Sequence, residues 1–101
     1  MLMELLDPDV VGYADLGPDV PDRPIQRGAD LVARNALRFF GATSGTTLVS
    51  HPIDGQPGVL AFRDRQLAAV IAFKTRGGRI FDIHASADPR RFTVLGLQRG
   101  Q

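Results

Sequence analysis

The run Leu67-Ala-Ala-Val-Ile-Ala-Phe73 restricts the fold more than any other segment, because it contains no polar side chain. A β-strand that is apolar on both faces must be covered on both sides. We therefore expect a long strand over residues 66–75, with one face against the interior of the domain. The other face is expected to be covered by a second copy of the chain, in a homodimer formed through the sheet.

Three further strands are expected on either side of this run. The expected strands are 47–53, 59–63 and 79–85. The turn sequences beside them are Asp54-Gly55, Asp64-Arg65 and Gly77-Gly78. Asp-Gly and Gly-Gly pairs are typical of tight hairpin turns, which join antiparallel neighbours. The second half of the chain therefore predicts four consecutive antiparallel strands.

One clear helix is expected before these strands. Gly28 and Gly41 mark its two ends, and Asp30 in the first turn suits the helix dipole. Its apolar side consists of Val32, Ala36, Phe39 and Phe40, and its basic side of Arg27, Arg34 and Arg38. The arginine stripe fits either an acidic partner or a solvated face. A helix followed by consecutive strands predicts an α+β fold, with one curved antiparallel sheet wrapped on the helix.

Prolines indicate the local structure of the first residues and of the C-terminal segment. Met1–Leu6 resembles the last turns of a helix, which Pro8 ends, and 10–14 is a short strand candidate. Residues 15–24 contain three prolines and predict a loop. After Ala87, Asp88-Pro89 predicts one helical turn.

Composition excludes several classes of function. The chain has 101 residues, which fits one domain, and it has no cysteine, which excludes disulfides and thiolate metal sites. Its net charge of +1 argues against direct nucleic-acid binding, because such modules usually carry a basic excess. No apolar run approaches the roughly 18 residues of a membrane span. We expect a cytoplasmic protein with no cofactor and no metal ion.

The order of short motifs resembles the SnoaL-like C-terminal domain of extracytoplasmic-function RNA polymerase sigma factors. The matching segments are Asp9–Gly17, Arg23–Ile25, Gly28–Arg34, Asp54–Gly58, Gly78–Ile80, Ile83–Ala85 and Asp88–Phe92. In that family the first loop usually reads Asp-Gly-Gly-Gly-Lys and the last Asn-Pro-Asp-Lys-Leu. Here they read Asp15-Leu-Gly17-Pro-Asp19 and Asp88-Pro-Arg-Arg-Phe92, so both depart from the usual pattern.

The resemblance implies a nuclear transport factor 2-like cone, in which a bent sheet encloses a cavity. It covers residues 1–95 as one domain and leaves 96–101 as a tail. Helices usually precede the first strand in such domains, so the N-terminal helix is expected to be missing or reduced. Regions 2 and 4, which bind promoter DNA and core polymerase, are also missing, so the chain is expected to be an excised domain or a truncated relative.

The resemblance also implies a non-catalytic function. The expected partners are sigma regions 2 and 4, and through them RNA polymerase, and the expected contact residues are Asp15, Gly17, Asp88, Pro89 and Arg91. Asp15 fits a turn-capping role equally well. Through these contacts the domain would regulate transcription initiation.

The alternative function is a small enzyme or ligand-binding protein with an apolar ligand in the cavity. Asp82 and His84 lie two residues apart and so share one face of the last strand. Inside a cone, this pair would serve as acid and base on an enolisable ligand. The other possibility is that Phe81, Ile83 and Ala85 form the inner face. His51 is a second histidine, and it is expected either to face the cavity or to lie on the surface of an edge strand. Two histidines without clustered acidic residues make a poor metal site.

Overall fold

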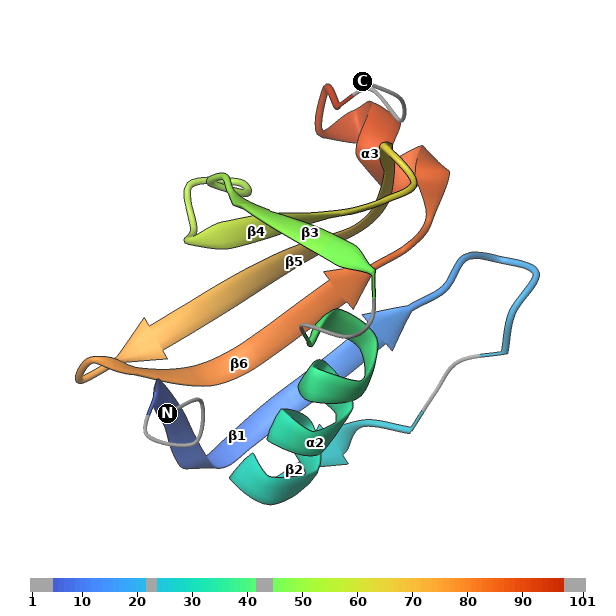
Figure 1. Ribbon diagram of the computed structural model, residues 1–101. Coiled ribbons are helices and arrows are strands. Elements are labelled where there is room, and N and C mark those ends of the chain that lie inside the picture. Colours follow the sequence, from blue (N-terminus) through green and yellow to red (C-terminus); the bar gives the residue numbers. More distant parts are fainter. Residues whose placement is uncertain (1–4, 22–23, 42–44, 98–101) are drawn as a thin grey trace.

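The computed structural model describes residues 5–21, 24–41 and 45–97, and these form one six-stranded sheet and two helices (Figure 1). The strands lie in the order β2-β1-β6-β5-β4-β3. The elements are β1 (Leu6–Asp15), β2 (Gln26–Arg27), α2 (Ala29–Phe40), β3 (Thr46–Ser50), β4 (Gly58–Arg63), β5 (Gln66–Arg76), β6 (Arg79–Ser86) and α3 (Pro89–Val94). The predicted helix, the four later strands and the helical turn after Asp88 are therefore present.

Two of the three hairpins in the second half, β4–β5 and β5–β6, turn at the residue pairs that the sequence predicted. Asp64 and Arg65 join β4 to β5 with φ angles of 53° and 66°, and Gly77 and Gly78 join β5 to β6 with 60° and 79°. Two consecutive residues with positive φ give a turn whose twist matches that of the flanking strands. This geometry explains why β4, β5 and β6 pair as antiparallel neighbours.

The first strand corrects two expectations. β1 pairs with β6 in parallel, so the sheet is mixed rather than wholly antiparallel. β1 also begins at Leu6, earlier than the strand predicted over 10–14, and so takes the last residue of the helix predicted over Met1–Leu6. Leu5 is helical, and residues 1–4 of that predicted helix lie outside the described residues. Pro8 falls within an irregularity of the pairing between Leu6 and Val11, where its missing N–H group does not interrupt a regular ladder.

The helix α2 packs on one face of the sheet. Its Val32 and Ala33 are buried against Leu6 and Val10 of β1, and Gly41 ends it by donating its N–H to the carbonyl of Leu37 at 2.9 Å. Arg27, Arg34 and Arg38 are exposed, so the basic stripe is a solvent-facing surface. Phe39 was expected on the buried side but is 44% exposed.

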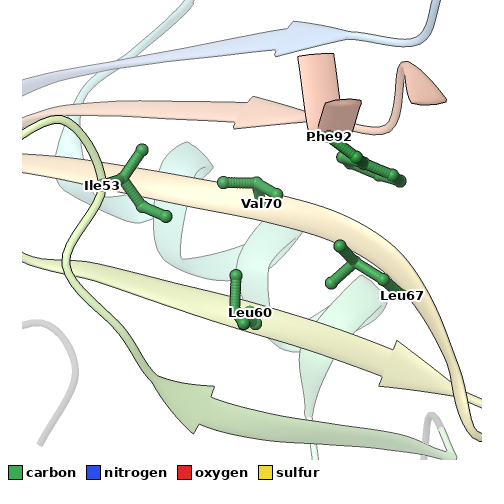
Figure 2. Close-up of a cluster of buried hydrophobic side chains, with 5 residues drawn as sticks. All are labelled: Ile53, Leu60, Leu67, Val70 and Phe92. Carbon is green, nitrogen blue, oxygen red and sulfur yellow. The ribbon is translucent and has the colours of Figure 1, made fainter. Parts of the chain in front are cut away.

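The short helix α3 covers the opposite face. Phe92 is buried among Leu67 and Val70 of β5, Leu60 of β4, and Ile53 (Figure 2). Ala69 and Ile71 belong to a separate cluster that Phe40 of α2 joins. Part of the apolar run of β5 is thus covered, by Phe40 of α2 on one face and by Phe92 of α3 on the other. The helix that follows the sheet supplies part of the cover that the sequence analysis assigned to a second copy.

Among the described residues, α2 has 12 residues and α3 has 6, so neither helix could cross a membrane.

Candidate functional site

The ends of β1 and β6 bring two distant loops together. Because these strands are parallel, the segments that follow Asp15 and Ser86 leave the sheet at the same edge. The N–H of Ala87 donates a hydrogen bond to the carbonyl of Asp15 at 2.8 Å. The hydroxyl of Ser86 donates to Oδ2 of Asp15 at 3.4 Å and accepts from the N–H of Asp88 at 3.3 Å. The two loops are therefore held to each other.

Asp88 lies at the centre of this contact. Its side chain is only 7% exposed, and its Oδ1 caps α3 by accepting from the backbone N–H of Arg90 at 3.0 Å. The guanidinium of Arg90 also bonds the carboxylate, with Nη2 3.0 Å from Oδ2. The side-chain and then the backbone hydrogen bond from Arg90 hold the pKa of Asp88 below its usual value. The arrangement therefore favours an ionised carboxylate.

Gly17 completes the site from the first loop. Its φ of 102° lies in the region that favours glycine, and its N–H donates to Oδ1 of Asp15 at 3.0 Å. A Cβ built on Gly17 would lie 4.0 Å from Cγ of Asp88. We call Asp15, Gly17, Ser86, Asp88 and Arg90 the loop cluster.

The loop cluster contains three of the five predicted contact residues, Asp15, Gly17 and Asp88. Pro89 follows directly as the first residue of α3. Arg91 differs, because its Nη2 forms a salt bridge with Oδ2 of Asp54 at 2.6 Å.

Ser86 and Arg90 were not expected at this site. Arg90 had a signal in the capping position of Asp88, since a capping carboxylate accepts from the N–H two residues further on. Ser86 had no such signal, because its hydroxyl bonds the backbone N–H of Asp88 and the distant Asp15. Arg90 is 72% exposed at its side chain, and the carboxylates of Asp88, then Asp15 and Asp19, raise its pKa. The cluster thus presents one exposed guanidinium surrounded by acids.

A cavity of about 310 Å³ lies between α2 and the sheet. Its walls include Ala61 and Ala69 from the middle of the sheet, and Phe39 and Phe40 from α2. Arg63, Asn35 and Gln26 supply its larger polar groups. The volume is at the lower end of the range of about 300–1,000 Å³ that is typical of small-molecule sites.

Asp82 and His84 do not line this cavity, whereas Ile83 and Ala85 do. His84 is opposite Ala72 of β5, and Ala72 packs with the α3-side cluster. Cross-strand partners point to the same face, so Asp82 and His84 lie on the face away from the cavity. His84 is exposed, with its ring 5.7 Å from that of Tyr13.

A bulge in β6 moves Ile80 to the inner side. Thr75 is opposite Ile80 and Lys74 is opposite Asp82, which leaves Phe81 as one extra residue. Ile80 therefore packs with Leu6 and Val10, although simple alternation placed it on the face of Asp82. The guanidinium of Arg76 lies over the ring of Phe81, with its Cζ 4.4 Å from the ring centroid.

His51 lies just after β3 and is exposed, with its Nδ1 2.8 Å from the carbonyl of Pro52. Within residues 5–21, 24–41 and 45–97, no three His, Asp or Glu side chains gather closely enough to hold a metal ion.

The sequence of the chain is similar to that of a known protein. The chain is 38% identical over 99 residues to the probable ECF RNA polymerase sigma factor SigI of Mycobacterium tuberculosis. The chain is related to the extracytoplasmic-function sigma factors. The match covers 98% of this chain but 32% of SigI, so the chain spans about a third of that relative's length. No protein-family model matches the chain.

Solved structures agree on the fold. The crystal structure of the extracytoplasmic function sigma factor SigJ of M. tuberculosis superposes with a TM-score of 0.67 and 24% identity, over 96% of this chain and 39% of SigJ. A nuclear transport factor 2-like protein of unknown function from Mesorhizobium loti superposes with a TM-score of 0.58 and 15% identity, over 84% of this chain and 73% of its own. The expected SnoaL-like, nuclear transport factor 2-like fold is confirmed.

Proposed function

We propose that this sigma-factor relative is a non-catalytic accessory domain that regulates transcription initiation in the cytoplasm through contacts with sigma regions 2 and 4. The observation that carries the proposal is the 38% identity over nearly the whole chain to one third of a sigma factor. The remaining two thirds of that relative have no counterpart in this chain. The net charge of +1 fits a division of labour in which DNA binding belongs to other regions.

The loop cluster is the proposed contact surface. It joins the two segments that the sequence resemblance singled out, although 71 residues separate Asp15 from Ser86. Arg90 extends into solvent beside acidic side chains, so the surface offers both charges to a partner. Charged groups arranged in this way orient a partner and limit which partners fit.

Co-purification tests this proposal. The full 101-residue chain is mixed with tagged regions 2 and 4 of an extracytoplasmic-function sigma factor from the same genome, and the dissociation constant is then measured. We expect binding, and we expect Arg90→Ala and Asp19→Ala to weaken it about tenfold or more. Arg34→Ala, an exposed arginine on α2, is the matched control and should leave it unchanged. Absence of binding, or equal effects of Arg90→Ala and Arg34→Ala, would overturn the proposal.

The alternative function loses its acid–base pair, because Asp82 and His84 lie on the other face of the sheet from the cavity. The cavity itself still supports binding of a small apolar ligand. The homodimer through the sheet stays a prediction, and sedimentation of the purified chain tests it directly.

A further inference from the structure

The cavity exists because small residues line it. Eight of its nineteen lining residues are glycine or alanine, among them Ala61 and Ala69 in the sheet and Ala36 on α2. Protein interiors are normally filled to the density of organic crystals. Small residues facing each other across a helix and a sheet leave space that no side chain of the described part of the chain fills. This space is wide enough for a ligand rather than for one buried water.

Arg63 brings a positive charge to the rim of this space. Its Nη2 donates to the carbonyl of Phe39 at 3.3 Å and to Oγ1 of Thr46 at 3.0 Å. These two bonds hold the guanidinium where the end of α2 meets β3 and β4. In the described part of the chain no carboxylate pairs with Arg63, and its Nε and Nη1 groups have no hydrogen-bond acceptor.

Two amides add to this polar edge. The side chains of Asn35 and Gln26 line the cavity, are half-buried, and make no hydrogen bond to another described residue. An amide that is partly removed from water without a partner is available to a ligand's polar atoms. The rest of the wall is mainly aliphatic and aromatic. The cavity therefore has an apolar body, a fixed cation at its rim and neutral donors beside it.

We infer that the cavity binds a small carboxylic acid with an apolar, ring-sized body, whose carboxylate pairs with Arg63. Nη2 already donates to Phe39 and Thr46, so the carboxylate accepts from Nη1 or Nε. A hydrogen bond between two charged groups is about twice as strong as one between neutral groups, and a neutral ligand cannot match it. The apolar part of the acid lies against Ala61, Ala69 and Phe40. This inference does not depend on contact with the sigma regions, because the ligand is held entirely by this chain.

A pair of probes tests the inference on the full chain. 3-Phenylpropionate carries the carboxylate, and 3-phenylpropionamide has the same shape without the charge. Each is titrated while backbone amide chemical shifts are followed by NMR. We expect saturable shifts at cavity residues such as Ala61, Ala69 and Ala85, and we expect the amide to bind about tenfold or more weakly.

Three variants test whether Arg63 supplies the charge that binds the acid. Arg63→Gln removes the guanidinium and should reduce the affinity for the acid to that for the amide. Arg79→Gln, an exposed arginine outside the cavity lining, is the matched control and should bind the acid as the parent chain does. Arg63→Lys keeps the charge but loses the planar group that bonds Phe39 and Thr46, and intermediate affinity is expected. Absence of shifts at the cavity, equal affinity for acid and amide, or equal affinity in Arg63→Gln and Arg79→Gln overturns the inference.

Discussion

The guanidinium of Arg90 bonds the carboxylate of Asp88 with Nη2 3.0 Å from Oδ2, while the same carboxylate caps the first turn of α3. One side chain thus starts the helix and fixes the exposed cation of the loop cluster. Loss of the Asp88 charge would therefore weaken both the start of α3 and the hold on Arg90.

Asp88 makes the stability of the chain depend on pH. Its pKa is lowered in the folded state, so its contribution is present above the ordinary carboxyl pKa and is lost as pH falls through the lowered value. Asp88→Asn keeps a capping oxygen but loses the charge. We expect Asp88→Asn to melt below the parent chain at pH 7, with the difference shrinking as the solution is acidified. A difference in Tm that stays constant down to pH 2 would contradict this.

Phe92 holds α3 to the sheet. It is 3% exposed among Leu60, Leu67 and Val70, so Phe92→Ala should lower the free energy of unfolding by about 3–5 kcal/mol in urea denaturation. Val94 on the same helix is 76% exposed, and Val94→Ala should change it by less than about 0.5 kcal/mol. Similar values for the two variants would mean that α3 does not cover this face of β5.

The strands of the second half were predictable from the sequence because each boundary is a local signal. Asp64-Arg65 and Gly77-Gly78 take positive φ, and turns of this kind fix the pairing of the strands beside them. The parallel pairing of β1 with β6 was not predicted, because about seventy residues separate the partners Gly12 and Ile83 and no local signal records such a contact.

The candidate site was predictable in part for the same reason. Asp15, Gly17 and Asp88 were found through motif order, but only the parallel strands bring them together. Asp82 and His84 share one face, as their spacing predicted, but the pairing of His84 with Ala72 puts that face away from the cavity. A cavity was expected, but Arg63 was not expected at its rim. The position of Arg63 there depends on hydrogen bonds to Phe39 and Thr46, which belong to two other elements.

Gly58 at the start of β4 is required by packing rather than by its backbone angles. A Cβ there would lie 2.7 Å from the carbonyl oxygen of His51 and 3.1 Å from that of Ile71, and backbone atoms cannot move aside cheaply. Gly58→Ala should therefore cost about 1–3 kcal/mol in the free energy of unfolding. Gly12→Ala is the matched strand variant, since its Cβ would be 3.5 Å from Cγ2 of Val32, an ordinary contact. Equal stability of the two variants in urea denaturation would refute this.

The cavity and the loop cluster share one wall, and this predicts that their two ligands influence each other. Ala14 and Leu16 line the cavity on either side of Asp15, and Ser86 at the end of β6 and Ala87 just after it also line it. An acid bound in the cavity contacts the segments that present the loop cluster. We therefore expect saturating 3-phenylpropionate to shift the backbone amides of Asp15 and Ala87 and to change the dissociation constant for the sigma regions several-fold.

Thermodynamic linkage fixes the second half of this prediction. The sigma regions must change the affinity for 3-phenylpropionate by the same factor, because coupling between two binding sites is reciprocal. Calorimetric titration of the acid with and without the sigma regions measures that factor. 3-Phenylpropionamide at the same concentration is the control for non-specific effects. Unchanged affinity in both directions, with both ligands bound, would show that the shared wall is rigid and that the two sites act independently.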